Sequence, residues 1–207
     1  MKKQILLGLF LVCSIGAFAQ SAKKADDQKW KARLRGILVM PPSSSYDLTS
    51  STKVTASKAF VPELDFTYYF SKNLAAELIL GTTRHTIKAE AGGSKTDLGK
   101  VWLLPPTLNL QYHFPLQGVE PYIGAGINYT IFYGVKDDAA KLSYKNNVGF
   151  STQLGCDFNV SDKWYINVDL KKLFLKTDVT VAGEGSTVLK GVKIDPFIVG
   201  IGIGTRF

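Results

Sequence analysis

Apolar and polar residues alternate along eight segments of this chain, and no other feature constrains its fold as strongly. The C-terminal segment, residues 197–207, shows the pattern most clearly. One face of this stretch carries Phe197, Val199, Ile201, Ile203, Thr205 and Phe207, and the other carries Ile198, Gly200, Gly202, Gly204 and Arg206. A period of two residues is that of a β-strand whose two faces meet different surroundings. The chain is therefore predicted to be all-β.

Seven further segments share this pattern: residues 30–40, 61–70, 74–86, 101–114, 122–133, 148–160 and 164–175. Each is near the length of roughly 9–11 residues that lets a tilted strand cross a bilayer. The connections alternate between short ones, at 71–73, 115–120 and 161–163, and long ones, at 41–59, 88–100, 134–147 and 176–193. Short turns on one side and long loops on the other are typical of a transmembrane barrel with both termini in the periplasm.

A soluble barrel of the lipocalin type is the alternative, with its apolar face inside and a charged face in water. Two features count against it. The polar rows are rich in Gly, Asn, Gln and Thr, and aromatic residues gather at the strand ends near the short turns. Such aromatic girdles mark the two interfaces of a membrane barrel. We therefore predict an eight-stranded antiparallel transmembrane β-barrel with short periplasmic turns and long extracellular loops, located in the cell outer membrane.

The N-terminus has the pattern of a secretory signal peptide over residues 1–19. Lys2 and Lys3 precede an apolar run that ends in the small-x-small sequence Ala17-Phe18-Ala19. An uncleaved anchor is the alternative, but the run is shorter than the about 20 apolar residues that a spanning helix needs. We predict that residues 20–207 form a single barrel domain. Loss of the two lysines takes the formal net charge from +8 to +6.

Two blocks of sequence are more specific than alternation. Residues 104–114 read LPPTLNLQYHF, and residues 121–130 read PYIGAGINYT. Together with residues 195–197 (DPF) and the terminal residues 204–207 (GTRF), they resemble the OmpW family of small outer-membrane barrels over the whole mature chain. The resemblance implies a narrow barrel that takes up small hydrophobic molecules through an apolar channel with lateral exit into the membrane. It also implies that the barrel-assembly machinery reads Phe207 as an assembly signal.

The lumen-facing residues of the predicted strands can be ordered along the barrel axis. Odd-numbered strands run from the periplasm to the cell exterior, and even-numbered strands run back. Near the periplasm the lumen is predicted to hold charges of both signs, here called the polar plug: Lys31, Arg33, Arg35, Glu77, Asp157, Asp169 and Arg206. In a narrow barrel these charges should pair and close the pore. Toward the extracellular end, the inward-facing residues become apolar. We call this set the apolar lumen: Ile37, Val39, Val101, Leu103, Phe132, Leu173, Leu175 and Ile198.

An apolar funnel above a charged plug suggests that a small hydrophobic solute enters from outside, stops at the plug and leaves sideways through the wall. Gly200, Gly202 and Gly204 leave space inside the last strand, which makes that strand one candidate exit. One alternative is a lumen packed solid by its apolar residues, since eight strands leave room for side chains or one small ligand. Another is a structural, adhesive or phage-receptor barrel with a non-conducting lumen.

The expected partners are outer-membrane lipid, lipopolysaccharide, the barrel-assembly machinery and a small hydrophobic solute. Loop lysines, together with Arg84 and Lys172 near the outer rim, are placed to meet lipopolysaccharide phosphates. The positive charge forms no continuous basic face, so we predict no nucleic-acid partner.

We predict no enzyme, cofactor or metal site. The two histidines, His85 and His113, are expected inside the barrel, and neither has a serine at a neighbouring lipid-facing position. No G-x-S-x-G motif occurs, and two histidines without clustered cysteines or carboxylates make a poor metal site. Each histidine is expected to be a hydrogen-bonded residue of the lumen.

Overall fold

The computed structural model describes residues 28–42, 46–49, 52–137, 141–182 and 187–207. The predicted signal peptide lies outside the described residues. Within them no helix has both the length and the apolar character that crossing a membrane requires.

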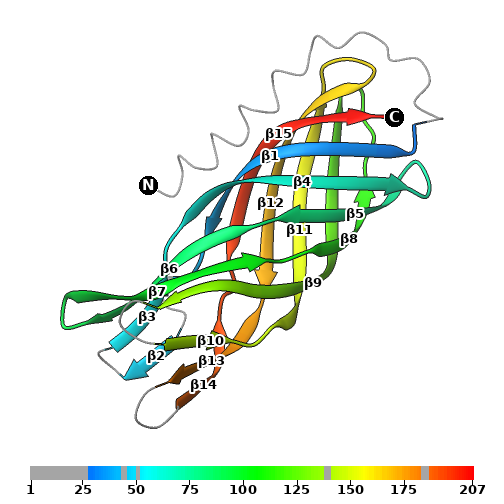
Figure 1. Cartoon of the computed structure of the whole chain (residues 1–207). Coiled ribbons are helices and arrows are strands. Elements are labelled where there is room, and N and C mark those ends of the chain that lie inside the picture. The colour runs from blue at the N-terminus through cyan, green and yellow to red at the C-terminus, as the bar shows by residue number, and fades with distance from the viewer. Residues whose placement is uncertain (1–27, 43–45, 50–51, 138–140, 183–186) are drawn as a thin grey trace.

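Eight antiparallel strands close into a barrel (Figure 1). In their order around the wall they are β1 (Trp30–Met40), β4 (Ala59–Tyr69), β5 (Leu74–Gly81), β8 (Thr107–His113), β9 (Val119–Asp137), β11 (Asn147–Asn159), β12 (Trp164–Phe174) and β15 (Phe197–Arg206). Closure is made by β1 and β15, which pair from Lys31 opposite Arg206 to Met40 opposite Phe197. The predicted eight-stranded antiparallel barrel is confirmed.

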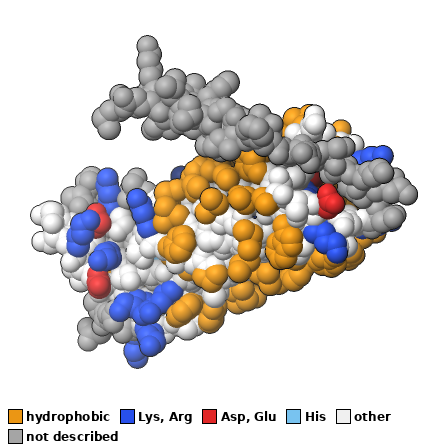
Figure 2. Space-filling model, turned by 90° about the horizontal axis from the view of Figure 1, so that it is seen from above, with side chains coloured by type: hydrophobic (Ala, Val, Ile, Leu, Met, Phe, Trp, Pro, Cys, Tyr) orange, Lys and Arg blue, Asp and Glu red, His pale blue; other side chains and the backbone are white. Residues whose placement is uncertain are grey.

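The outward face of this barrel is apolar and the inward face is polar, which is the reverse of a lipocalin. Side chains such as Leu34, Leu108 and Ile201 are more than half exposed on the outside, whereas Arg33 and Arg35 are buried inside. Figure 2 shows the hydrophobic side chains over the middle of the molecule and the charged ones gathered toward its ends. Aromatic pairs lie near the short turns, with the rings of Trp30 and Tyr68 4.8 Å apart. This surface suits a hydrocarbon layer with aromatic residues at its edge.

The long connections carry β-structure of their own, of which the sequence analysis predicted only residues 83–86 and 101–104 as strand. Their strands continue the wall outward: β2 (Tyr46–Thr49), β3 (Thr52–Ala56), β6 (Thr83–Ala91), β7 (Ser94–Leu104), β10 (Lys141–Tyr144), β13 (Lys176–Ala182) and β14 (Thr187–Lys193). Strands β2, β3, β6 and β7 extend the main sheet, and β10, β13 and β14 form a second sheet. The lumen therefore reaches well beyond the eight barrel strands.

Two predicted strands are each split in two. The segment 74–86 divides at Thr82 into β5 and β6, and the segment 101–114 divides at Pro105 and Pro106 into β7 and β8. Proline has no backbone N–H and so interrupts the ladder. These breaks mark the level at which the barrel gives way to its outer extension.

Candidate functional site

The inner half of the lumen is filled by an ionic network centred on two arginines of β1. Arg33 donates from Nε to Asp65 Oδ1 at 2.6 Å and from Nη2 to Glu77. Arg35 Nη2 lies 2.8 Å from Glu63 Oε1 and 3.2 Å from Glu77 Oε1, and its Nη1 lies 3.4 Å from Asp169 Oδ2. All of these side chains are buried. Each guanidinium is thus held by carboxylates from several strands, as buried charges require.

A second layer of charges lies nearer the short turns. Lys31 Nζ lies 2.9 Å from Asp157 Oδ2 and 3.0 Å from Glu120 Oε1. Arg206 also contacts Glu120, at 3.2 Å, and Tyr69 donates its hydroxyl to the same carboxylate at 2.6 Å. Glu120 therefore joins the start of β9 to β1, β4 and β15 across the lumen.

Amide and phenol groups fill the space between the charges. Asn109 Nδ2 donates to Gln153 Oε1 at 2.9 Å, and Gln153 Nε2 donates to Asp169 Oδ2 at 2.7 Å. Tyr122 also donates to Asp169, at 2.7 Å. Among the described residues, the polar side chains of this half are therefore joined by hydrogen bonds across the lumen.

The glycines of β15 do not open an exit, contrary to one option raised by the sequence. A Cβ at Gly204 would overlap the Tyr165 ring, so the space that this glycine leaves is already filled. Backbone pairing is also continuous on both sides of β15, with β1 and with β12.

The structure places all seven residues of the polar plug in this network, each of them buried. Sequence reasoning left out their partners Glu63, Asp65, Glu120 and Lys171. The alternation of 61–70 put Glu63 and Asp65 on the inward face, and that of 164–175 put Lys171 on the polar face with Asp169, so the signal was present for these three. Glu120 was assigned to a turn, because the pattern gave no sign that β9 begins at Val119.

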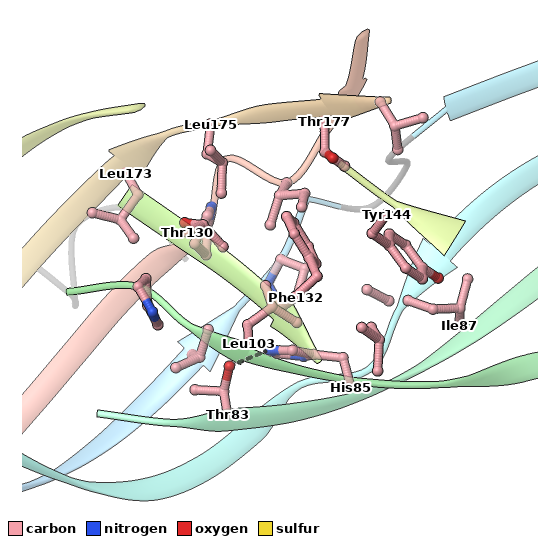
Figure 3. Close-up of a pocket in the computed structure, with 18 of the residues that line it drawn as sticks. Thr83, His85, Ile87, Leu103, Thr130, Phe132, Tyr144, Leu173, Leu175 and Thr177 are labelled. Atoms are coloured by element: carbon pink, nitrogen blue, oxygen red, sulfur yellow. Dashed lines mark hydrogen bonds between the residues drawn. The ribbon is translucent and has the colours of Figure 1, made fainter. Parts of the chain in front are cut away.

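The outer half of the lumen holds a cavity of about 370 Å³ with almost entirely apolar walls. All eight residues of the apolar lumen line it. In Figure 3, Leu103, Phe132 and Leu173, from three different strands, and Leu175, between β12 and β13, surround one common space. Ile37, Val39, Leu173 and Ile198 pack together as a buried cluster in its wall. We call this space the apolar cavity.

Residues of the long connections complete the apolar cavity. Leu142, Val179 and Val192 form a second buried cluster, against which Tyr144 and Val181 pack. They come from β10, β13 and β14, which had been predicted as polar loop. The signal was visible in residues 176–182, where Thr177, Val179 and Val181 alternate with polar residues.

Both histidines are hydrogen-bonded inside the barrel. His85 lines the apolar cavity and uses Nδ1 with the Ser57 carbonyl at 2.6 Å and Nε2 with Thr83 Oγ1 at 3.1 Å. His113 lies in the inner half, 3.0 Å from Gln111 Oε1 and 2.8 Å from Glu120 Oε1.

The backbone hydrogen-bond ladder of the barrel wall is interrupted beside β4, at the level where β5 ends and β6 begins. Ladder pairing of β4 with β5 ends at Glu63 opposite Gly81, and pairing resumes only where β3 meets β6, at Ala56 opposite Ile87. One backbone bond, from Ser57 N to Thr86 O at 2.9 Å, lies at the outer end of this interval. Residues 58–62 and 82–85, all described, make no ladder pairing with each other. Thr83, on the edge of this gap, lines the apolar cavity.

A closed antiparallel barrel with an apolar belt outside and a polar core inside defines an outer-membrane β-barrel protein. The chain belongs to the OmpW family, whose model matches residues 29–207.

The comparisons with individual proteins agree with this assignment. The chain is 44% identical to an uncharacterized outer-membrane protein, y4mB of Sinorhizobium fredii, over 86% of this chain and 80% of that protein. It is 32% identical to the dibenzothiophene metabolism operon protein PahQ of Pseudomonas aeruginosa, over 88% and 83% of the two chains. The crystal structure of the outer membrane protein OprG from Pseudomonas aeruginosa matches with a TM-score of 0.76 at 24% identity, covering 87% of this chain and 96% of that one.

Proposed function

We propose that this protein takes up small hydrophobic molecules across the outer membrane, with the apolar cavity as the entry site and lateral release into the lipid. The observation that carries the proposal is an open apolar cavity directly above a lumen closed by paired charges. A strongly polar solute would gain few partners from walls that are mostly apolar. A continuous water path would require the polar plug to separate. The relative PahQ, named for dibenzothiophene metabolism, supports an apolar aromatic cargo, since dibenzothiophene is a fused aromatic ring system with one thioether-type sulfur and no charged group.

The open cavity also favours this proposal over a solidly packed lumen. A space of about 370 Å³ falls in the range of small-molecule sites, roughly 300–1,000 Å³. A barrel with a purely structural or adhesive role would not need such a space.

The exit is proposed to lie in the wall gap between residues 58–62 and 82–85. Pro62 has no backbone N–H with which to close the ladder there. Phe60, on the outer face beside the gap, is 75% exposed, so the gap adjoins an apolar, lipid-facing surface. A solute leaving the apolar cavity past Thr83 would therefore meet lipid rather than water.

Filling this gap should block release. The variant Thr83→Trp is expected to reduce accumulation of radiolabelled naphthalene by Gram-negative cells to the level of cells without the barrel, because a ring at this position occupies the edge of the gap. The matched control is Val181→Trp, which also adds an indole to the cavity lining, but on β13, which belongs to the second sheet and does not pair with β6. Equal loss of uptake in both variants would place the exit elsewhere.

Contact with lipopolysaccharide is proposed for the outer end of the barrel. Figure 2 shows lysine and arginine side chains gathered there. Lys88 and Lys95 pair with Asp97 and Glu90 at 3.2 and 2.8 Å but remain well exposed, so they are available to phosphates as well. Of the two rim residues, Arg84 lies over the Trp102 ring at 5.7 Å and Lys172 donates to the Asp195 carbonyl.

Phe207 is proposed as the assembly signal, with both termini on the periplasmic side. Its backbone N donates to Trp30 O at 2.9 Å and closes the last rung of the barrel, while its ring is 58% exposed. The variant Phe207→Ser is expected to lower the yield of folded barrel in cell membranes, measured by heat-modifiable migration in gels. Phe70→Ser removes an equally exposed aromatic residue near a short turn, and it should assemble normally. Equal yields of the two variants would argue against a specific signal.

A further inference from the structure

The floor of the apolar cavity carries one ion pair, between Glu63 of β4 and Lys171 of β12. Lys171 Nζ lies 2.6 Å from Glu63 Oε1, and both residues line the cavity. The two residues are only 5% and 2% exposed, so this pair is shielded from bulk water. It is the point at which the apolar walls give way to the charged inner half.

The pair keeps unused hydrogen-bonding capacity. Among the described residues, both ionic contacts of Glu63, with Lys171 and with Arg35 Nη2 at 2.8 Å, go to Oε1. The Lys171 ammonium contacts Glu63 Oε1 and, at 3.5 Å, Asp169 Oδ1. These two contacts use at most two of its three N–H groups. One carboxylate oxygen and one N–H are therefore left for a molecule that reaches the cavity floor.

We propose that the apolar cavity selects hydrophobic molecules that carry one neutral hydroxyl group, such as a phenol or a fatty alcohol. The hydroxyl would donate to Glu63 Oε2 and accept from Lys171 Nζ, while the hydrocarbon part fills the cavity above. This inference rests on the proposed function and names its substrate class.

The charge of the floor explains why the group should be neutral. Glu63 and Lys171 already balance each other, and a carboxylate beside Lys171 would also lie beside Glu63. An ammonium beside Glu63 would likewise approach Lys171 and Arg35. Like charges this close in a weakly polar site repel strongly, whereas a hydroxyl can both donate and accept without adding charge.

The remaining walls explain why one polar group is preferred over several. His85 and Thr83, two polar residues of the cavity lining, already bond to each other, and His85 also bonds to the Ser57 carbonyl. Figure 3 shows this pair beside the apolar side chains that surround it. A second hydroxyl on the ligand would thus lose water without gaining an equivalent partner.

The test compares three probes that share one ring system: naphthalene, 2-naphthol and 2-naphthoate. Each is bound at neutral pH to the full-length protein in lipid nanodiscs, and the partitioning into protein-free discs is subtracted. Wild-type protein is expected to bind 2-naphthol about tenfold more tightly than naphthalene, since hydrogen bonds to charged groups are among the stronger ones. It should bind 2-naphthoate more weakly than 2-naphthol.

The double variant Glu63→Leu, Lys171→Met removes the pair while nearly preserving side-chain volume, and Arg35 keeps its contacts with Asp65, Glu77 and Asp169. It should bind the two neutral probes with equal affinity. The control Lys88→Met, Asp97→Leu removes an exposed ion pair outside the cavity and should keep the wild-type preference.

Three results would overturn the inference: equal binding of naphthalene and 2-naphthol by wild-type protein, tightest binding of 2-naphthoate, or a preference that survives in the double variant. The wild-type comparison decides the matter even if the double variant fails to fold. Failure of the proposed function gives a different result, because naphthalene itself would then not bind above the protein-free discs.

Discussion

The variant Arg33→Met is expected to lose about 3–5 kcal/mol of unfolding free energy, the usual cost of breaking a buried ion pair by removing one partner. Arg33 lies within ion-pair distance of Asp65, Glu77 and Asp157, all of them buried. Methionine fills much of the same volume but supplies no charge, so these carboxylates would have to share the remaining cations. The loss should be measured by urea unfolding of the purified barrel in lipid, followed by tryptophan fluorescence.

A matched control separates the buried network from charge loss in general. Lys88→Met removes a lysine from a pair whose side chains are 38% and 50% exposed, and exposed pairs contribute below about 1 kcal/mol. If Arg33→Met were no less stable than Lys88→Met, the polar plug would not be the element that holds the inner half of the barrel together.

The variant Leu103→Asp is expected to abolish uptake while leaving the barrel folded. Leu103 lines the apolar cavity and is 6% exposed, so a carboxylate there would draw water into the space that the solute must occupy. Uptake of radiolabelled naphthalene should fall to that of cells without the barrel, and Phe132→Asp should act in the same way. Leu103→Met, which keeps the wall apolar, should transport normally. Normal uptake by folded Leu103→Asp would argue against the cavity as the route.

The alternation of residues predicted much of this molecule because membrane and lumen impose opposite demands on the two faces of each strand. It placed Arg33 and Arg35 inside, and the strand directions put Leu103 and Leu173 above them. The resemblance to the OmpW family, carried most specifically by two short blocks and predicted to span the mature chain, is confirmed by the family model over residues 29–207.

Pairing between distant residues could not be predicted in the same way. Lys171 and Glu63 are far apart in the sequence, and their contact depends on the register of every intervening strand. The ladder interruption beside Pro62 is likewise a property of three strands together. Alternation predicts which face of the strand a residue lies on, and strand direction predicts its position along the barrel axis. Neither predicts which residue of another strand it contacts.

The outer strands were missed for a different reason. Most of their segments are short, with 4 to 7 residues in β2, β3, β10, β13 and β14, and polar residues outnumber apolar ones in Lys176–Ala182. A short alternating run in a polar connection is weak evidence for a strand on its own. Here these strands are stabilised by the outward continuation of the barrel wall, which supplies them with neighbours.

The most direct test is a crystal structure of the full-length protein soaked with 1-bromonaphthalene, in which anomalous scattering locates the bromine. We predict a bromine peak inside the apolar cavity, within about 4.5 Å of the side chains of Leu103, Phe132 or Leu173, as expected for apolar contact. No peak is expected among the charges of the polar plug. Bromine found only on the lipid-facing surface, with the cavity holding ordered water, would contradict the account.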